Sequence, residues 1–449
     1  MCDRLCKGIM GYVLGLCLIG LPTAASASVP NDVQALYDRK DYQKTVEEIG
    51  KLSKEAAAAP DVRRLKVRAL LRSGKPKEAL EEYDKLESTL KQDEVPLLRE
   101  VALGFIVAMM KDMREQMRGA AYTALKEVDS DEVIPYFEDG LSDGSGPVRV
   151  LAAEGLGRLE AGRKSKKLRA ALEDQAGFVK ARVVKALGKT GDASVLPLIE
   201  TASKDELTAV RIAAYGALIR LGKKDGWDQL RKAADAPNPE DRAEALRTIA
   251  ELKDQRGAEL MTELLTYKQP SVRAAAARGL GHLGRQEARA GIERLLKDPV
   301  PAVRESAASA LAELGAKESV SLLTQTLGDG AHTVRAASVA ALLQLDQPYE
   351  TVASTVRGLI QQNDTAVRAS AAFALGKATK ANSREAIAVL MTLSGDPLPG
   401  PKIVALRSLG HVGNRELIPF IKDALHDDNE AVRATAAGAL LHLLQLKNS

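Results

Sequence analysis

The sequence predicts an all-α protein, a right-handed α-solenoid built of helix–turn–helix repeats. Three observations predict this fold. A Val-Arg-like pair recurs along the chain at a nearly constant interval, apolar residues follow each pair at helical spacing, and a second apolar run precedes each pair.

The basic residue of each pair marks one repeat. Successive markers are 31 residues apart seven times, and the last three intervals are 33, 34 and 31 residues. The eleven markers are Arg118, Arg149, Lys180, Arg211, Arg242, Arg273, Arg304, Arg335, Arg368, Lys402 and Arg433. The two longer intervals predict a local change in curvature with stacking maintained.

Each unit is expected to contain two helices of roughly ten to fourteen residues. The third residue after the marker is small or apolar and the seventh is Leu or Ile, so positions three, four and seven form one face of the second helix. An apolar run upstream, such as residues 194–199 or 416–421, supplies the first helix. Small side chains on the second helix allow successive units to stack closely.

An aspartate stands six residues before the marker in eight of the eleven units. This position falls in the turn between the two helices. The aspartate is therefore expected to cap the second helix and to reach the arginine of a stacked neighbour.

This pattern, with Asp in the turn and Val-Arg followed by Ala and Ala-Leu-Gly, resembles HEAT-like repeats of the short kind named after the phycobilisome lyases. The resemblance covers residues from about 96 to 445, and we assign residues 96–449 to this solenoid of eleven units. HEAT arrays mostly serve as scaffolds and adaptors, so the resemblance implies a role in protein–protein interaction.

Residues 28–95 have a period of their own. Residues 35–52 align with residues 69–86 at an offset of 34, with Lys40 at the turn position that Gly74 takes in the second copy. This segment is similar to tetratricopeptide repeats. Two copies are fewer than a stable array needs, so we expect them to continue directly onto the HEAT-like units.

Residues 1–27 predict a cleavable signal peptide. A short basic region precedes a nearly uncharged run from Ile9 to Leu21, and small residues occupy positions 25–27. The run is shorter than a membrane anchor requires. Cleavage after Ala27 would place the mature protein in a periplasm or outside the cell. All cysteines lie in this leader, at Cys2, Cys6 and Cys17, so the mature chain would lack disulfides and thiolates.

The residue pattern does not favour catalysis. Residues 279–284 match the letters of a dinucleotide fingerprint and residues 140–144 those of a nucleophile elbow, but neither follows a strand. The deoxyhypusine hydroxylases are HEAT-like and bind iron through His-Glu pairs, whereas no histidine of this chain precedes a glutamate. We therefore expect a non-catalytic protein without metal or cofactor. The alternative is a HEAT-like enzyme or cofactor-handling protein, similar to a bilin lyase or a metal-dependent hydroxylase.

A binding face is predicted on the second helices, at the fifth and ninth positions after each marker, which should line the inner, concave surface. Its basic residues are Arg158, Lys185, Lys189, Arg220, Arg247, Arg278, His282, Lys377, Arg407 and His411. Its acidic residues are Glu127, Glu154, Glu251 and Glu313. This is either a solvated face or a groove for an acidic protein segment or another anion.

In the second interpretation, Arg220, Arg247 and Arg278 form the centre of the groove, reinforced by His282, because guanidinium groups suit carboxylates. A net charge of +4 and an aromatic content of 3% do not favour nucleic acid as the partner. We expect a protein partner, and no membrane-spanning segment after removal of the leader.

Overall fold

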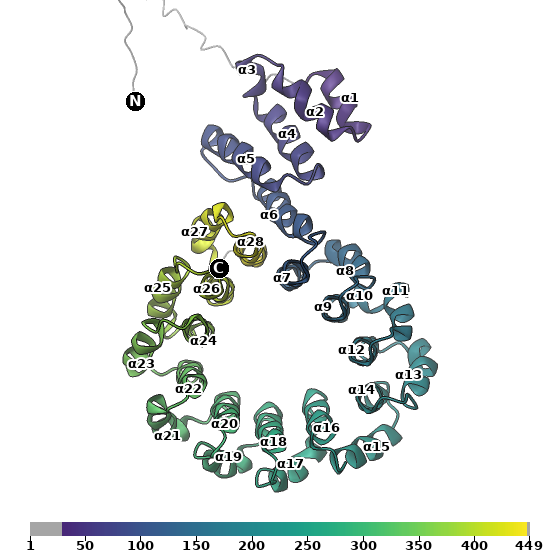
Figure 1. Cartoon of the computed structure of the whole chain (residues 1–449), viewed down its shortest axis with the longest axis vertical. Helices are drawn as coiled ribbons and strands as arrows, with labels where there is room; N and C mark the ends of the chain where they lie inside the picture. The colour runs from purple at the N-terminus through teal and green to yellow at the C-terminus, as the bar shows by residue number, and fades with distance from the viewer. Residues whose placement is uncertain (1–28, 447–449) are drawn as a thin grey trace, which may run out of the picture.

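The computed structural model describes residues 29–446, so the predicted signal peptide lies outside the described part. Within these residues the chain is helical and contains no strand. The helices form a ring with a short arm that projects from it (Figure 1). The all-α solenoid is confirmed, but its two ends meet.

The second helices of the eleven units face the lumen of the ring, and the first helices lie outside them (Figure 1). The inner helices are α7 (Glu115–Leu125), α9 (Gly146–Arg158), α12 (Gly177–Leu187), α14 (Thr208–Arg220), α16 (Pro239–Glu251), α18 (Pro270–Leu283), α20 (Pro301–Glu313), α22 (His332–Gln344), α24 (Thr365–Leu375), α26 (Pro399–Val412) and α28 (Glu430–Gln445). The outer helices are α6 (Val95–Met109), α8 (Ile134–Gly140), α10 (Glu160–Arg163) and α11 (Lys166–Ala170) in one unit, α13 (Leu196–Ala202), α15 (Asp225–Ala234), α17 (Ala258–Leu264), α19 (Arg289–Leu295), α21 (Val320–Gln325), α23 (Glu350–Ile360), α25 (Ser383–Leu393) and α27 (Ile418–Asp423).

Several outer helices are shorter than predicted. The helices α8, α13, α17, α19, α21 and α27 have only six or seven residues. Each of them is preceded by a three-residue 3₁₀ turn, as at Asp131–Val133 before α8. The apolar run is therefore divided between a 3₁₀ turn and a short α-helix, which shortens the α-helical part.

The predicted contact between the marker arginine and a neighbour's turn aspartate is present. Arg304 is typical: its Nε and Nη2 donate to the carboxylate of Asp329 in the next unit, at 2.7 and 2.8 Å. Its Nη1 donates to the backbone carbonyls of Asp298 and Pro299 in its own turn. The same ion pair joins Arg118 to Asp143, Arg149 to Asp174, Lys180 to Asp205, Arg273 to Asp298, Arg368 to Asp396 and Lys402 to Asp427. We call this series the ion-pair ladder.

The ladder aspartates do not occupy the N-cap position itself. Asp329 accepts the backbone N–H of Ala331, which is the N-cap residue of α22. The aspartate thus fixes the turn two residues before the cap. In the unit after Arg242, Tyr267 occupies the position of the turn aspartate. The guanidinium group of Arg242 lies over its ring, 4.6 Å from the ring centre.

Glycine allows the inner helices to approach closely. A Cβ on Gly281 of α18 would lie 2.8 Å from the Cα of Ala310 on α20, which is closer than carbon atoms pack. Gly188 meets Ala217 in the same way. The small residues of the second helices are therefore packing elements, as predicted.

The ring closes where α28 packs against α6 (Val95–Met109) and α7. Gly438 of α28 lies against the backbone of Ala124 on α7, and a Cβ there would be 2.9 Å from the Ala124 carbonyl oxygen. On the outside, Lys422 Nζ lies 2.6 Å from Glu87 and 2.9 Å from Asp93. The concave surface predicted from the sequence is consequently a closed lumen.

The arm consists of α1 (Asn31–Asp38), α2 (Tyr42–Gly50), α3 (Lys54–Ala57), α4 (Pro60–Arg72) and α5 (Pro76–Leu90). The turns between α1 and α2 and between α4 and α5 contain Lys40 and Gly74, whose φ angles are +65° and +74°. The two residues aligned at an offset of 34 thus have the same left-handed turn conformation. α5 packs on α6, so the arm continues onto the array as expected.

Candidate binding site in the lumen

One part of the lumen is a hollow of about 540 Å³ rich in basic side chains. Its charged residues are seven Lys or Arg and three Glu, with one histidine, His282. They are Lys126, Arg158, Arg182, Lys185, Lys189, Arg220, Arg407, Glu127, Glu154 and Glu251. We call this region the cationic hollow. Its lining comes from the inner helices α7, α9, α12, α14, α16, α18 and α26 and the turns after them, so it includes residues from both ends of the array.

Some cations of the hollow are partly neutralised by carboxylates of the protein itself. Lys126 and Arg182 both pair with Glu154, at 2.9 and 3.2 Å. Lys185 Nζ lies 2.9 Å from Glu244 and 3.2 Å from Glu251.

Four other cations of the hollow have no carboxylate partner within residues 29–446: Arg158, Lys189, Arg220 and Arg407. The guanidinium group of Arg158 donates to the backbone carbonyl of Lys126, and Arg220 donates to that of Glu251 at 3.1 Å. These carbonyl groups carry no compensating charge. The four residues form a positive cluster without direct carboxylate partners, which we call the lumen tetrad.

Burial disfavours the charged forms of two members of the tetrad, Lys189 and Arg220. Burial lowers the pKa of the Lys189 ammonium below its ordinary range, and the nearby charge of Arg220 lowers it further. Burial also lowers the pKa of Arg220, although Glu251 acts in the opposite direction. An anion bound in the hollow would relieve both effects, because an opposite charge stabilises the charged form.

The three arginines of the predicted centre do not line one hollow. Arg220 lines the cationic hollow, but Arg247 Nε lies 2.9 Å from Glu244 and Arg278 Nη2 lies 3.4 Å from Glu305. Arg247 does not line the cationic hollow, and Arg278 lines a neighbouring one. Positive charge without a direct carboxylate partner therefore gathers around the lumen tetrad, since the other two arginines of the row each have a glutamate beside them, and Arg247 shares its glutamate with Lys185.

The remaining predicted residues lie along the same lumen. Lys185, Lys189, His282 and Arg407 line the cationic hollow. His411 lies beside it at the closure of the ring, where its Nε2 is 3.5 Å from Glu127. Burial lowers the pKa of His411 and Glu127 partly offsets this, so burial favours the neutral imidazole.

Two basic residues of the hollow were not anticipated. Lys126 and Arg182 stand eight and two residues after their markers, whereas only the fifth and ninth positions were assigned to the inner surface. Successive residues of a helix are about 100° apart, so a curved inner surface also exposes the neighbours of those positions. Assigning a wider sector of each second helix to the inner surface would have included Lys126 and Arg182.

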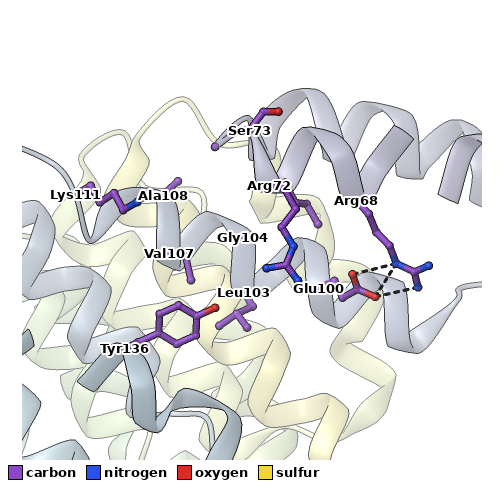
Figure 2. Close-up of a pocket in the computed structure, with 12 residues that line it drawn as sticks. Arg68, Arg72, Ser73, Glu100, Leu103, Gly104, Val107, Ala108, Lys111 and Tyr136 are labelled. Carbon is purple, nitrogen blue, oxygen red and sulfur yellow. Dashed lines mark hydrogen bonds and ion pairs between the residues drawn. The ribbon is translucent and has the colours of Figure 1, made fainter. Parts of the chain in front are cut away.

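A second hollow, of about 450 Å³, lies outside the lumen where the arm meets the ring (Figure 2). Its apolar side chains include Leu103 and Val107 of α6, and Tyr136 of α8 forms part of its wall. Arg68 and Glu100 form an ion pair at 3.0 Å at one side of it. Its lining comes from α4, α6 and α8, where the arm and the array join, so the repeat pattern gave no indication of it.

No group of three or more histidine, cysteine or acidic side chains suited to a metal ion occurs among residues 29–446. In the same range, no helix combines the length and the apolar character that crossing a bilayer requires.

Stacked helical hairpins, an ion-pair ladder and a lined lumen define a helical-repeat protein whose repeats close into a ring. The chain belongs to the HEAT-repeat family. The family model for HEAT repeats matches residues 165–236, 227–299, 258–343, 290–376 and 393–443, which together make up more than half of the chain. These matches do not extend to the arm. No curated protein matches the chain.

Several solved structures are similar in fold. Human deoxyhypusine hydroxylase, in complex with glycerol, is 22% identical, with 63% of this chain and 98% of that chain covered and a TM-score of 0.32. The complex of CpcE and CpcF of phycocyanin lyase from Nostoc is 19% identical, with 55% and 94% covered and a TM-score of 0.38. Kap121p bound to Nup53p is 13% identical, with 90% and 54% covered and a TM-score of 0.38. Likenesses of this size carry no argument about function.

Proposed function

We propose that the protein is a non-catalytic scaffold or adaptor that binds an acidic segment of a partner protein in the lumen of its ring. The observation that carries the proposal is the lumen tetrad, four basic side chains without a carboxylate partner in the described chain. Extended surfaces of helical-repeat proteins commonly bind partners. Because the ring is closed, the segment would reach the lumen from one of its two open faces.

A labelled peptide of ten glutamates tests the proposal by fluorescence anisotropy. The variant Arg158→Gln/Lys189→Gln/Arg220→Gln removes three charges of the tetrad. We expect its affinity at low salt to fall at least tenfold, since charge-assisted contacts are among the strong ones. Binding by the unchanged protein should also weaken as salt is added, because salt screens these contacts.

A matched control removes the same charge from the outside. Arg231 and Lys232 lie on the outer helix α15, and Lys297 follows α19; all three are exposed. The variant Arg231→Gln/Lys232→Gln/Lys297→Gln should bind the peptide within about twofold of the unchanged protein. Equal losses in the two triple variants would mean that net charge, and no particular site, determines binding.

We also propose that the protein acts in a cell envelope after removal of residues 1–27. The order of basic, apolar and small residues in the leader supports this. The mass of the protein purified from its native cell tests it, with Ser28 as the expected first residue. An intact leader would contradict the proposed export, while stoichiometric iron, zinc or a bound chromophore would contradict a non-catalytic scaffold.

A further inference from the structure

The lumen contains a second hollow beside the cationic one. It has a volume of about 460 Å³ and lies on α18, α20, α22 and α24. Four alanines of α22 line it, and Phe373 of α24 lines it as well. We call it the alanine hollow.

Phe373 is unusual for this chain. Only five phenylalanines occur in 449 residues, and the side chain of this one is 61% exposed on an inner helix. Lys377 Nζ lies 5.3 Å from the centre of its ring. Single exposed apolar side chains are ordinary on protein surfaces. Here, however, the ring adjoins small apolar side chains within a concave surface, which is the usual composition of a ligand pocket.

The charges around the alanine hollow are largely compensated. Arg278 pairs with Glu305, and Glu313 faces His282, whose Nδ1 is 3.9 Å away. His282 also lines the cationic hollow, so the two hollows are neighbours in the same lumen. One of them offers positive charge without direct carboxylate partners, and the other offers apolar surface with no strong excess of charge.

We infer that the partner segment is acidic and also carries an apolar side chain, which packs against Phe373 in the alanine hollow while its carboxylates contact the lumen tetrad. This inference rests on the proposed function and specifies the partner's chemistry. Two features favour a peptide over a fatty acid or similar amphiphile. The cationic hollow holds more basic groups than one carboxylate can use, and the polar Ser309, Gln344 and Ser370 interrupt the apolar wall.

The test compares the ten-glutamate peptide with ten variants of it, each with leucine at one position. Leucine removes a charge, so without the alanine hollow every substitution should weaken binding. We expect leucine at one or two positions to strengthen binding at least fivefold. Phe373→Ser should abolish this gain and leave the affinity for the all-glutamate peptide unchanged. Phe373→Leu should retain most of the gain.

Phe178 provides the matched control. Its side chain is 56% exposed at the start of α12, and it lines neither hollow. Phe178→Ser should therefore keep the gain. A gain that survives Phe373→Ser, or leucine peptides that never bind more tightly than the all-glutamate peptide, would overturn the inference while the proposed function stands. Failure of the all-glutamate peptide itself to bind would contradict the proposed function. Displacement of the peptides by dodecanoate that depends on Phe373, without any leucine gain, would identify an amphiphile as the occupant and overturn the inference.

Discussion

Replacing Arg304 with alanine should destabilise the protein more than replacing Arg335, although both arginines hold their own turn in the same way. Arg335 Nη1 donates to the carbonyls of Asp329 and Gly330, just as Arg304 Nη1 donates to those of Asp298 and Pro299. Only Arg304 has a ladder aspartate, because Gln362 occupies the corresponding position in the unit after Arg335. The difference between the two variants therefore isolates the contact between units.

The size of that difference follows from the geometry. Arg304 makes two charge-assisted hydrogen bonds to Asp329, and the side chains are only 16% and 12% exposed. A hydrogen bond to a charged group contributes about 1.5–3 kcal/mol, and removing one partner leaves the other charge desolvated. Asp329 keeps the N–H of Ala331, which limits the loss. We expect Arg304→Ala to cost about 2–3 kcal/mol more than Arg335→Ala.

Urea unfolding followed by far-ultraviolet circular dichroism measures this difference, as a shift in midpoint at unchanged slope. The unfolding midpoint of Arg304→Lys should fall between those of the unchanged protein and Arg304→Ala. Lysine can form this ion pair, because Lys180 and Lys402 of the ladder lie 2.8 and 2.6 Å from their aspartates. Equal losses of stability in Arg304→Ala and Arg335→Ala would contradict a stabilising contact between units, since both arginines would then act only within their own units.

Three further outcomes are expected. Gly438→Leu should clash with the backbone of Ala124, open the ring and so enlarge the hydrodynamic radius. Gly358→Leu, which places its side chain in open space on α23, should leave the radius unchanged. An unchanged radius in both variants would contradict tight closure of the ring. The hydrogen bond from Arg304 holds the pKa of Asp329 below its ordinary value of 3.8. The ion pair therefore stabilises the folded protein above pH 3.8, and this stabilisation is lost as the pH falls through the lowered pKa. Acid unfolding of Asp329→Asn should accordingly show a shallower loss of stability below about pH 4, and an identical acid limb would contradict this. Because the pKa of Lys189 is lowered from 10.5, affinity for the glutamate peptide should begin to fall at a pH below that of ordinary lysine titration, and Lys189→Arg should remove this early fall.

The ladder could be predicted because each rung depends on two residues at fixed positions in a repeated unit. The closure could not be. It depends on small rotations accumulated over eleven units, and the close approach of α28 to α7 uses Gly438, five residues after its marker. The close contacts of Gly188 and Gly281 come eight residues after theirs.

The cationic face was predicted in position but not in its balance of charge. Residues at the fifth and ninth positions after the markers do line the lumen, and Arg220 is one of them. Glu244 and Glu305, which pair with Arg247 and Arg278, stand two residues and one residue after their markers. A pattern that follows only two positions per unit cannot show which charges are compensated, since ion pairs also join neighbouring positions across stacked helices.

Carbodiimide cross-linking tests the closed ring most directly, because it joins amines to carboxylates already in contact and needs no substitution. In the monomeric fraction, a closed ring should yield a cross-linked peptide that joins Lys422 to Glu87 or Asp93, more than 300 residues away in sequence. The pair Lys185 and Glu244, 2.9 Å apart within the array, is the internal positive control. Recovery of the Lys185–Glu244 cross-link without any link from Lys422 to Glu87 or Asp93 would contradict a closed ring and the enclosed lumen that depends on it.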